Sequence, residues 1–396
     1  MLGIFFQSLI RHFSWWMTSL WPGRHGAAPL SGRRLLFLFL FYPAFAAFQL
    51  LHWLGFLCDE LCFASYRTVE VKAPVFIIGI PRSGTTFLHR TLAEDRARFT
   101  SFSTWEAILA PSITERKVLR GIRSIDHALG APLQRIVHKL LDSASGDFND
   151  IHEVGLRAPE EDYLSLLPAG ACFILLLAFP FSPQLRQLGQ LDEMPAQSRE
   201  RILLFYKRAL QRHLYCHPGK QLLSKNAAFA TWAGALNATF PDAKFLVCVR
   251  EPTAALSSQL SSLTSARSFF ATDSTGDETT RTFTRLYAQF YASLDAFIAS
   301  SPPDQSAVIA QSDLKAAPAP TITAALDQLQ IESNPAIDHT LATIQPGKPS
   351  AHQHDPSDFS INPKEIQHCM NPHYEAMLHS PNRTSPKLDT STTGIP

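Results

Sequence analysis

The chain is poor in charged residues and has almost no net charge. Asp, Glu, Lys and Arg make up 17% of the 396 residues, and the formal net charge is +1. A chain with so small an excess of positive charge does not present a broad surface to the phosphates of DNA or RNA, so we expect no nucleic-acid partner. The low charge, together with 28 phenylalanines, predicts an extensive apolar core or contact with lipid.

Cysteine and metal-ligand patterns are also sparse. The six cysteines are scattered, only Cys58 and Cys62 are close together, and no histidine pair with ligand spacing accompanies them. Zinc sites and disulfide frameworks both require regular cysteine spacing. We therefore expect reduced thiols and no metal ion.

One long segment has no charged residue. Residues 35–58 (LLFLFLFYPAFAAFQLLHWLGFLC) are long enough to cross a bilayer. Arg33 and Arg34 precede the segment, which predicts a cytoplasmic N-terminus, and no cleavage pattern marks it as a signal peptide. The segment is interrupted by Pro43, Gln49 and His52. A helix half-inserted in one leaflet, and a buried hairpin packed on the rest of the protein, are therefore alternatives to a span.

The residues on either side of this segment complete the predicted organisation. Residues 4–21 are rich in Phe and Trp, which predicts an interfacial helix because tryptophan favours the headgroup level. We divide the chain into a hydrophobic membrane-associating helical region (1–72), a main domain (73–378) and a flexible tail (379–396) of polar composition.

After residue 73, short apolar runs alternate with amphipathic stretches. This alternation is typical of an α/β fold, with a central parallel sheet flanked by helices and ligands outside the carboxyl ends of the strands. We predict strands over 75–78, 221–224, 244–249 and 306–311. We predict helices over 159–179, 198–217, 230–240, 252–260, 278–299 and 321–329.

The turn after the first predicted strand is suited to an anion. It runs Gly-Ile-Pro-Arg-Ser-Gly from residue 79 to residue 84, and a helix follows. The free N–H groups at a helix N-terminus attract phosphate. Ser83, Thr85 and Thr86 add hydroxyl donors, and Arg82 adds a planar cation. We predict a phosphate-binding loop; the alternative is a strand–turn–helix junction without a ligand.

This loop lacks the residue that defines a nucleoside triphosphatase. Gly79 and Gly84 have the spacing of a P-loop, but Thr85 stands where that motif requires lysine. Such a lysine neutralises the β- and γ-phosphates beside a magnesium ion. We therefore expect the loop to bind a terminal phosphate without metal-dependent triphosphate chemistry.

Two further cations follow predicted strands. Arg250 comes directly after strand 244–249, and Ser258 lies in the next helix; Lys225 follows strand 221–224. Taken alone, Arg250 could pair with Glu251 and Lys225 could be a solvated charge. Because the carboxyl ends of parallel strands lie at one edge of a sheet, we expect Arg82, Arg250 and Lys225 to surround a bis-phosphorylated nucleotide.

These residues resemble those of a known family. The segments Pro81-Arg-Ser-Gly-Thr-Thr86, Lys225-Asn226 and Phe240 to Pro252, with Ser258, are similar to sulfotransferases that use 3′-phosphoadenosine 5′-phosphosulfate (PAPS). The similarity is closest to the branch of tyrosylprotein sulfotransferases and their bacterial relatives, and it extends over about residues 73–374. It implies a P-loop-containing nucleotide-binding fold with PAPS as co-substrate and no metal.

The resemblance also implies roles for single residues. Arg82, Ser83, Gly84, Thr85 and Thr86 would bind the 5′-phosphosulfate. The 3′-phosphate would lie on Arg250 and Ser258. Arg82 and Lys225 would stabilise the leaving group, and Lys225 would contact the bridging oxygen.

A general base must also remove the proton of the acceptor hydroxyl. In this branch it is a glutamate about two dozen residues after the loop arginine, which implies Glu106 in Ser-Thr-Trp-Glu. His152 is a second candidate, because the cytosolic branch uses histidine, although a lone histidine is more often structural. Glu160 and Glu161 are expected to be charges at a helix N-terminus; Glu161 ranks third as a base.

The sequence thus predicts a membrane-associated sulfotransferase that acts on a hydroxyl acceptor, such as a lipid or a glycan. The alternatives are a P-loop kinase and an inactive scaffold that binds adenosine 3′,5′-bisphosphate (PAP). The domain would face the cytosol in a bacterial enzyme and the lumen in a Golgi-type enzyme. In the lumenal case the sequon at Asn382 would be a glycosylation site.

Overall fold

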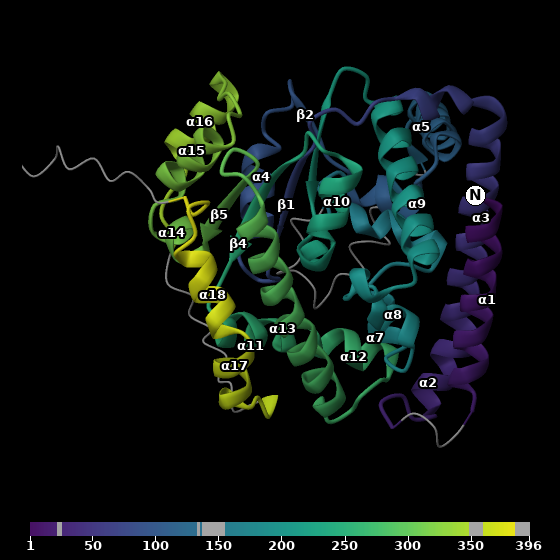
Figure 1. Cartoon of the computed structure of the whole chain (residues 1–396). Coiled ribbons are helices and arrows are strands. Elements are labelled where there is room, and N and C mark those ends of the chain that lie inside the picture. The colour runs from purple at the N-terminus through teal and green to yellow at the C-terminus, as the bar shows by residue number, and fades with distance from the viewer. Residues whose placement is uncertain (22–25, 133–134, 137–154, 348–358, 385–396) are drawn as a thin grey trace, which may run out of the picture.

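A computed structural model describes residues 1–21, 26–132, 135–136, 155–347 and 359–384 of the chain. Its centre is a parallel sheet of five strands in the order β2-β3-β1-β4-β5 (Figure 1). The strands are β1 (Val75–Gly79), β2 (Phe99–Thr100), β3 (Gln221–Lys225), β4 (Lys244–Val249) and β5 (Ser306–Ala310). The chain leaves β1 toward β2 and β3 on one side and later reaches β4 and β5 on the other, so the strand order reverses at β1, where α/β folds bind ligands.

Alternate side chains of β1 face two hydrophobic cores. Val75 and Ile77 belong to the smaller core, whereas Phe76 and Ile78 belong to the larger one. The smaller core is covered by α4 (Thr85–Leu92), α14 (Gln311–Ala316), α15 (Pro318–Gln328) and α16 (Pro335–Thr343). The larger core is covered by α9 (Ala196–Cys216), α10 (Ala233–Thr239), α11 (Pro252–Ser262) and α13 (Asp277–Ser300). Both faces of the sheet are therefore buried, as expected of parallel strands.

Shorter elements connect these layers. They include π-turn η3 (Trp105–Leu109), α5 (Ile113–Ala128), 3₁₀ segment η5 (Asp162–Ala169), α7 (Leu175–Ala178), α8 (Pro183–Gln187) and α12 (Thr264–Phe270). Other 3₁₀ turns are η2 (Ala64–Thr68), η6 (Leu191–Glu193) and η7 (Ala227–Trp232). The C-terminal helices are α17 (Pro363–Cys369) and α18 (Asn371–Leu378).

The predicted strands and most predicted helices are confirmed, and the exceptions have physical causes. The two-residue strand β2 is too short to give a sequence pattern. The predicted helix over 159–179 is wrong: Pro159 pairs with Ser103 in a bridge, and only η5 and α7 are helical in that range. Pro168 inside η5 and the left-handed Gly170 after it interrupt a continuous helix.

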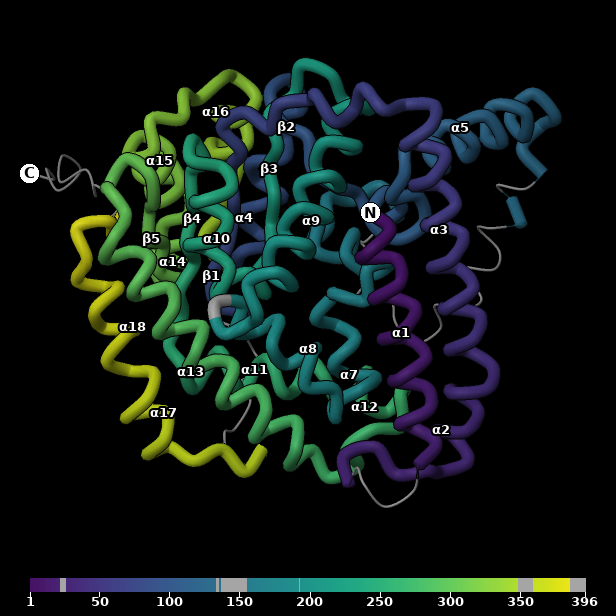
Figure 2. The backbone as a smooth tube through the Cα atoms, turned by 45° about the vertical axis from the view of Figure 1, so that its right-hand side comes forward, coloured from purple at the N-terminus to yellow at the C-terminus, as the bar shows by residue number. Residues whose placement is uncertain are grey.

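The N-terminal helices pack along one side of the main domain. Helix α1 (Leu2–Ser19) lies beside a long helix made of α2 (Gly32–Leu36), η1 (Phe37–Phe41) and α3 (Tyr42–Cys62) (Figure 2). Trp15, Tyr42 and Trp53 belong to the same core cluster as the sheet residue Phe76. The long helix is apolar and long enough to cross a membrane, yet part of its surface is buried against protein.

The flexible tail predicted from residue 379 is wrong at its start. Residues 379–384 are described, and Asn382 is 1% exposed. Its amide Nδ2 donates hydrogen bonds to Ser306 Oγ (2.6 Å) and to the carbonyl oxygen of Ser301 (3.0 Å). Thr384 N donates to the carbonyl oxygen of Val308 in β5. A glycan cannot occupy a buried nitrogen that already donates two hydrogen bonds, so Asn382 is not a glycosylation site in this fold.

We expect Asn382→Ala to lower the free energy of unfolding by roughly 1–3 kcal/mol, because the substitution leaves buried acceptors of the β5 region unpaired. Urea denaturation monitored by tryptophan fluorescence would measure this. Glu375→Gln, on the exposed side of α18, is the matched control and should change stability by less than about 0.5 kcal/mol. Equal stability of both variants and the native chain would contradict this role of Asn382.

Candidate active site

The loop between β1 and α4 depends on two glycines. Gly79 has φ 144°, and a Cβ built on it would lie 2.1 Å from the carbonyl oxygen of Cys248 in β4. Gly84 has φ 96° and is the N-cap of α4, where no side chain caps the helix. Only glycine fits at both positions. The first-turn N–H groups of α4, at Thr85, Thr86 and Phe87, therefore remain available to an anion.

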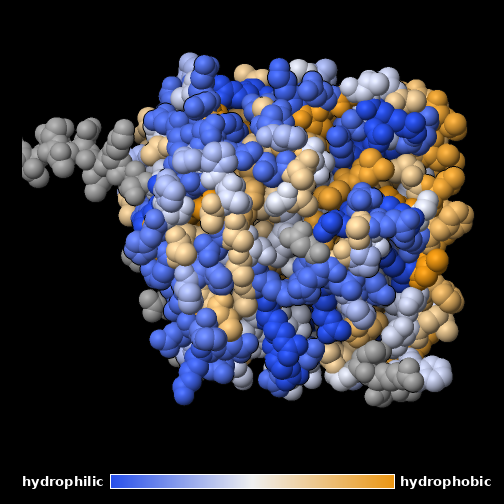
Figure 3. All heavy atoms as spheres, viewed as in Figure 1, coloured by the Kyte–Doolittle hydropathy of each residue, from blue (hydrophilic) through white to orange (hydrophobic). Residues whose placement is uncertain are grey.

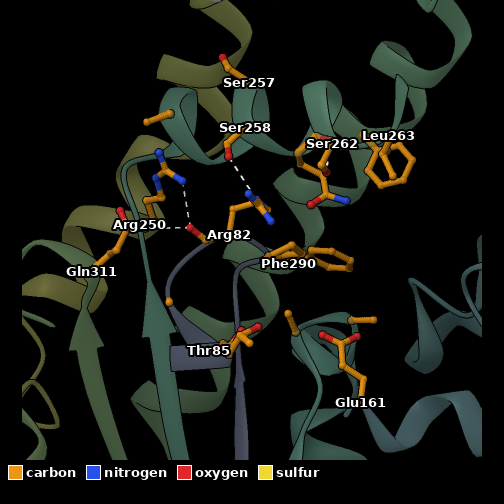
Figure 4. A pocket seen from close by; sticks show the side chains of 18 of the residues that line it. Arg82, Thr85, Glu161, Arg250, Ser257, Ser258, Ser262, Leu263, Phe290 and Gln311 are labelled. Atoms are coloured by element: carbon orange, nitrogen blue, oxygen red, sulfur yellow. Dashed lines mark hydrogen bonds between the residues drawn. The ribbon is translucent and has the colours of Figure 1, made fainter. Parts of the chain in front are cut away.

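Arg82 has a left-handed backbone and is held by neighbouring strands. Its φ is 71°, which is unfavourable for any residue other than glycine. Its carbonyl oxygen accepts hydrogen bonds from Arg250 Nη1 (3.0 Å) and Gln311 Nε2 (2.9 Å). Its side-chain Nε donates to Ser258 Oγ (3.1 Å). The residues predicted to bind two separate phosphates thus meet at Arg82 (Figure 4).

The two guanidinium groups have no carboxylate partner within the described chain. Neither Arg82 nor Arg250 forms an ion pair there. Glu251, the alternative partner of Arg250, instead accepts hydrogen bonds from Thr253 N (2.8 Å) and Ala254 N (2.7 Å) and caps α11. Burial and then the charge of Arg82 lower the pKa of Arg250. Two adjacent uncompensated cations form a strong site for an anion.

Ser83 differs from its neighbours in the loop. Its side chain is fully buried, its Oγ does not line the cavity, and its backbone N donates to the carbonyl oxygen of Ile80 (3.2 Å). Arg82, Gly84, Thr85 and Thr86 all line the cavity. Of the predicted loop residues, these four are therefore placed to contact a ligand directly.

Lys225 lies on the other side of the loop. Its Nζ is 3.2 Å from Thr86 Oγ1 and 2.8 Å from Glu161 Oε1, and Glu160 Oε1 is farther away, at 3.9 Å. Lys225 is 5% exposed. The register pairs Lys225 with Ile77 of β1, which brings its side chain to the start of α4. A lysine from the adjacent strand thus approaches the loop that has no lysine of its own.

Glu161 is positioned by a buried clamp next to it in sequence. Asn226, directly after β3, donates to the carboxylate of Asp162 and accepts from Tyr163 N (3.1 Å). Tyr206 also donates to Asp162 (3.0 Å), and burial raises the pKa of Asp162 to about 6. The clamp fixes the segment that carries Glu161 against the end of β3.

These groups surround one cavity of about 1180 Å³. Its polar half contains Arg82, Thr85, Arg250 and Ser258, with Glu161 across the opening (Figure 4). Its other half is apolar and is lined by Phe173, Ile174, Leu177, Leu263, Phe283 and Phe290. Binding pockets for a single small molecule usually measure roughly 300–1,000 Å³, so this cavity has room for a nucleotide and a second substrate.

Residues 74–335 match the model of the sulfotransferase family. The chain belongs to that family. Among solved structures it is similar to the sulfotransferase STF1 of Mycobacterium tuberculosis, with 17% identity over 93% of this chain and 92% of that one (TM-score 0.65). It is also similar to the sulfotransferase STF9 of Mycobacterium avium, with 16% identity over 95% of both chains (TM-score 0.65). The search of curated proteins finds no match.

Glu106 does not line the cavity of this sulfotransferase. It is 4% exposed in η3, and its carboxylate accepts hydrogen bonds from Ser103 Oγ (2.7 Å) and from His217 Nε2 (2.9 Å). Arg116 Nη1 lies 3.4 Å away. Burial alone would raise the pKa of Glu106, but the hydrogen bond from His217 and the charge of Arg116 outweigh it and hold that pKa well below its usual value. The contacts tie η3 to α5 and α9.

The remaining base candidate, His152, lies outside the described residues.

The structure brings three possible metal ligands together. Glu106, His213 and His217 have ligand atoms close enough to hold a metal ion. Arg116 Nη1, however, lies 3.2 Å from His213 Nδ1 as well as beside Glu106. A guanidinium next to both ligands would repel a divalent cation, so these residues fit a buried ion network better than a metal site.

Two functional features were missed from the sequence. Gln311 holds the Arg82 carbonyl and directly follows β5; the strand-end rule that selected Arg250 would have found it. The clamp of Asn226 and Asp162 had no such signal, because its two residues are far apart in sequence.

We expect Glu106→Gln to lower the free energy of unfolding at neutral pH by roughly 3–5 kcal/mol, because it leaves the buried Arg116 without its carboxylate. A carboxylate whose pKa is lower in the folded state stabilises the fold at pH values above 4.5, its pKa in the unfolded chain. That stabilisation is lost as the pH falls below this value. The stability gap between native chain and variant should therefore narrow in urea denaturations performed at decreasing pH.

The half-exposed Glu160 offers the matched control. Glu160→Gln should show only a small stability change at neutral pH. A gap for Glu106→Gln that stays constant with pH would show that its carboxylate does not contribute through its charge.

Proposed function

We propose that this sulfotransferase transfers a sulfuryl group from PAPS to a hydroxyl acceptor by in-line displacement. The observation that supports it most is the pair of uncompensated guanidiniums, Arg82 and Arg250, beside the uncapped N-terminus of α4. A donor with a 5′-phosphate and a 3′-phosphate on its ribose would place the first on the loop with Arg82 and the second on Arg250. The neutral adenosine between them suits a cavity with both polar and apolar walls.

Each donor-binding residue has a distinct contribution. The first-turn amides of α4, with the hydroxyls of Thr85 and Thr86, would donate to the 5′-phosphosulfate. Arg250 and Ser258 would bind the 3′-phosphate. Arg82 lies between the two regions and would release Ser258 to reach the 5′ end, whereas Ser83 would support the loop through its backbone.

Glu161 is the general base that the geometry supports best. Among the described residues lining the cavity, Glu161 and Glu251 carry the carboxylates, and both oxygens of Glu251 already cap α11. In the transfer, the acceptor oxygen forms a bond to sulfur while the bond between sulfur and the phosphate oxygen breaks. The acceptor proton passes to Glu161, and the negative charge of the leaving phosphate is stabilised by Lys225 and the loop amides.

The alternatives are less well supported. A P-loop kinase needs its lysine after the second glycine, where Thr85 stands, and the family of the chain does not favour kinase chemistry. An inactive PAP-binding scaffold would need no base in the cavity, whereas Glu161 lies 2.8 Å from Lys225 beside the loop.

The acceptor is expected to have an apolar body. The apolar part of the cavity wall consists of aromatic and aliphatic side chains from residues 173–177, from α13 and from Leu263. Sugars are usually held by polar side chains with many hydrogen bonds, whereas an apolar wall gains free energy by covering hydrocarbon. Of the two acceptor classes considered, a lipid-like alcohol or phenol therefore fits better than a glycan. The apolar N-terminal helix supports association with a membrane.

We expect the native protein to bind PAP without added metal, and Arg250→Ala to bind it about 10- to 100-fold more weakly, because charge-assisted hydrogen bonds to the 3′-phosphate are lost. Isothermal titration calorimetry would measure both affinities. The matched control is Arg281→Ala, whose guanidinium pairs with Glu278 on the surface of α13. Magnesium-dependent binding of ATP in place of PAP would overturn the proposal and favour a kinase.

We expect Glu161→Gln to reduce kcat by roughly 10²–10⁴-fold, the usual contribution of a general base, while PAP affinity is retained. Transfer from labelled PAPS to the best acceptor in a screen of long-chain alcohols and phenols would measure the rate. Glu160→Gln is the matched control, since Glu160 does not line the cavity. A loss of kcat in folded Glu106→Gln, but not in Glu161→Gln, would return the base to Glu106.

A further inference from the structure

The N-terminal helices expose a continuous apolar face. On α1 the exposed large side chains are Leu2, Phe6, Ile10, Phe13 and Met17, and Trp21 follows the helix. On the long helix they are Leu35, Leu36, Phe39, Leu40, Phe41, Leu50, Leu51, Leu54, Leu57 and Leu61. Every exposed residue between 35 and 57 is apolar. Hydrophobic atoms accordingly run along the margin of the molecule where α1 and α3 lie (Figure 3).

The opposite face of the long helix is fixed to the main domain by polar contacts near both ends. Near its start, Arg34 is fully buried and donates to the carbonyl oxygens of Ala178 (2.8 Å) and Phe270 (3.0 Å). Near its end, Asp59 pairs with Arg212 of α9 (2.9 Å). Between them, Trp53 Nε1 donates to a backbone carbonyl of η5 (2.9 Å).

These contacts are incompatible with a helix that crosses the bilayer. The helix of 31 residues is about 46 Å long at 1.5 Å per residue, and the domain contacts it from Arg34 to Asp59. A perpendicular helix would carry the domain into the hydrocarbon or leave the buried Arg34 and Asp59 without partners. A helix lying in the plane of the membrane keeps its polar contacts and inserts only its exposed face.

Helix α5 provides a second, independent feature beside this face. It begins next to α3, where Asp59 accepts hydrogen bonds from Ile113 N (2.9 Å) and Thr114 N (2.8 Å), and its later part projects away from the domain (Figure 2). Val118, Ile122, Ile125 and Leu129 are exposed at helical spacing. Lys117, Arg120 and Arg123 are exposed on the same helix. Apolar residues with flanking cations are typical of helices that lie on anionic membranes.

We propose that α1, the helix of residues 32–62 and α5 together form a monotopic docking surface for the headgroup region of an anionic lipid bilayer. This proposal rests on the membrane association proposed above, but not on the transfer reaction. A second copy of the chain fits less well: a two-fold interface must complement itself. The acids of the long helix, Asp59 and Glu60, are already paired with Arg212, and Glu115 of α5 is paired with His52, so these carboxylates would not bind the α5 cations of a second copy.

Vesicle flotation of the full chain tests the lipid preference. We expect binding to vesicles of phosphatidylcholine and phosphatidylglycerol in equal parts to exceed binding to pure phosphatidylcholine. Arg120→Gln with Arg123→Gln should weaken the anionic binding by about fivefold for each charge removed. Leu50→Asp with Leu54→Asp should abolish binding to both vesicles. Arg281→Gln on α13 is the control for charge and should leave binding unchanged.

A labelling experiment separates a docked helix from a spanning one. Arg33→Cys and the native Cys62 mark its two ends, and both positions are exposed. After addition of the protein to preformed sealed vesicles, a membrane-impermeant maleimide outside should label both ends, as located by mass spectrometry. Labelling of one end only would overturn the monotopic arrangement and show a span.

The other outcomes are equally decisive. Equal binding to both vesicle types would overturn the role of the α5 cations. A stable dimer by light scattering that no longer binds vesicles would show that a second copy covers the face. PAP calorimetry on each variant confirms folding, and it also keeps the two proposals separate: vesicle binding without PAP binding would contradict the donor assignment alone.

Discussion

The close approach of β1 to β4 is the constraint on which the site depends. With Gly79 against the carbonyl of Cys248, the chain leaves β1 directly over the end of β4, and Arg250 meets the backbone of Arg82 there. This contact holds Arg82 in a left-handed conformation, which costs of order 1 kcal/mol or more and persists only because the surroundings fix it. The loop, the two guanidiniums and the N-terminus of α4 are consequently organised before any ligand is present.

These contacts fix the positive charges of the site before a substrate binds. Sulfuryl transfer resembles phosphoryl transfer in that the protein contributes mainly positioning and electrostatic stabilisation. In this fold the cation missing from the loop is supplied by β3, whose Lys225 reaches Thr86. The same strand end holds Asp162 through Asn226 and so places Glu161. One strand therefore positions both the group expected to stabilise the leaving oxygen and the carboxylate expected to accept the proton.

The N-terminal helices have two faces of different character. Their inner face contributes Trp15 and Trp53 to the main core, and Arg34 anchors the long helix through its buried contacts. The outer face of the long helix is apolar, and that helix is long enough to cross a membrane. Such a helix satisfies its polar groups within the protein and exposes only hydrocarbon, which is the arrangement that a bilayer surface tolerates.

Local patterns specify strands, turns and helix starts, and they were enough to locate the loop at residues 79–86 and the cations that follow two later strands. Which carboxylate lines the cavity depends on tertiary packing. Glu106 has suitable spacing, but Arg116 and His217 hold it elsewhere, and such long-range pairing leaves no local signal. Likewise, hydropathy detected the segment 35–58, but packing against the domain decided which of its faces is exposed, and burial beside Ser306 decided the state of Asn382.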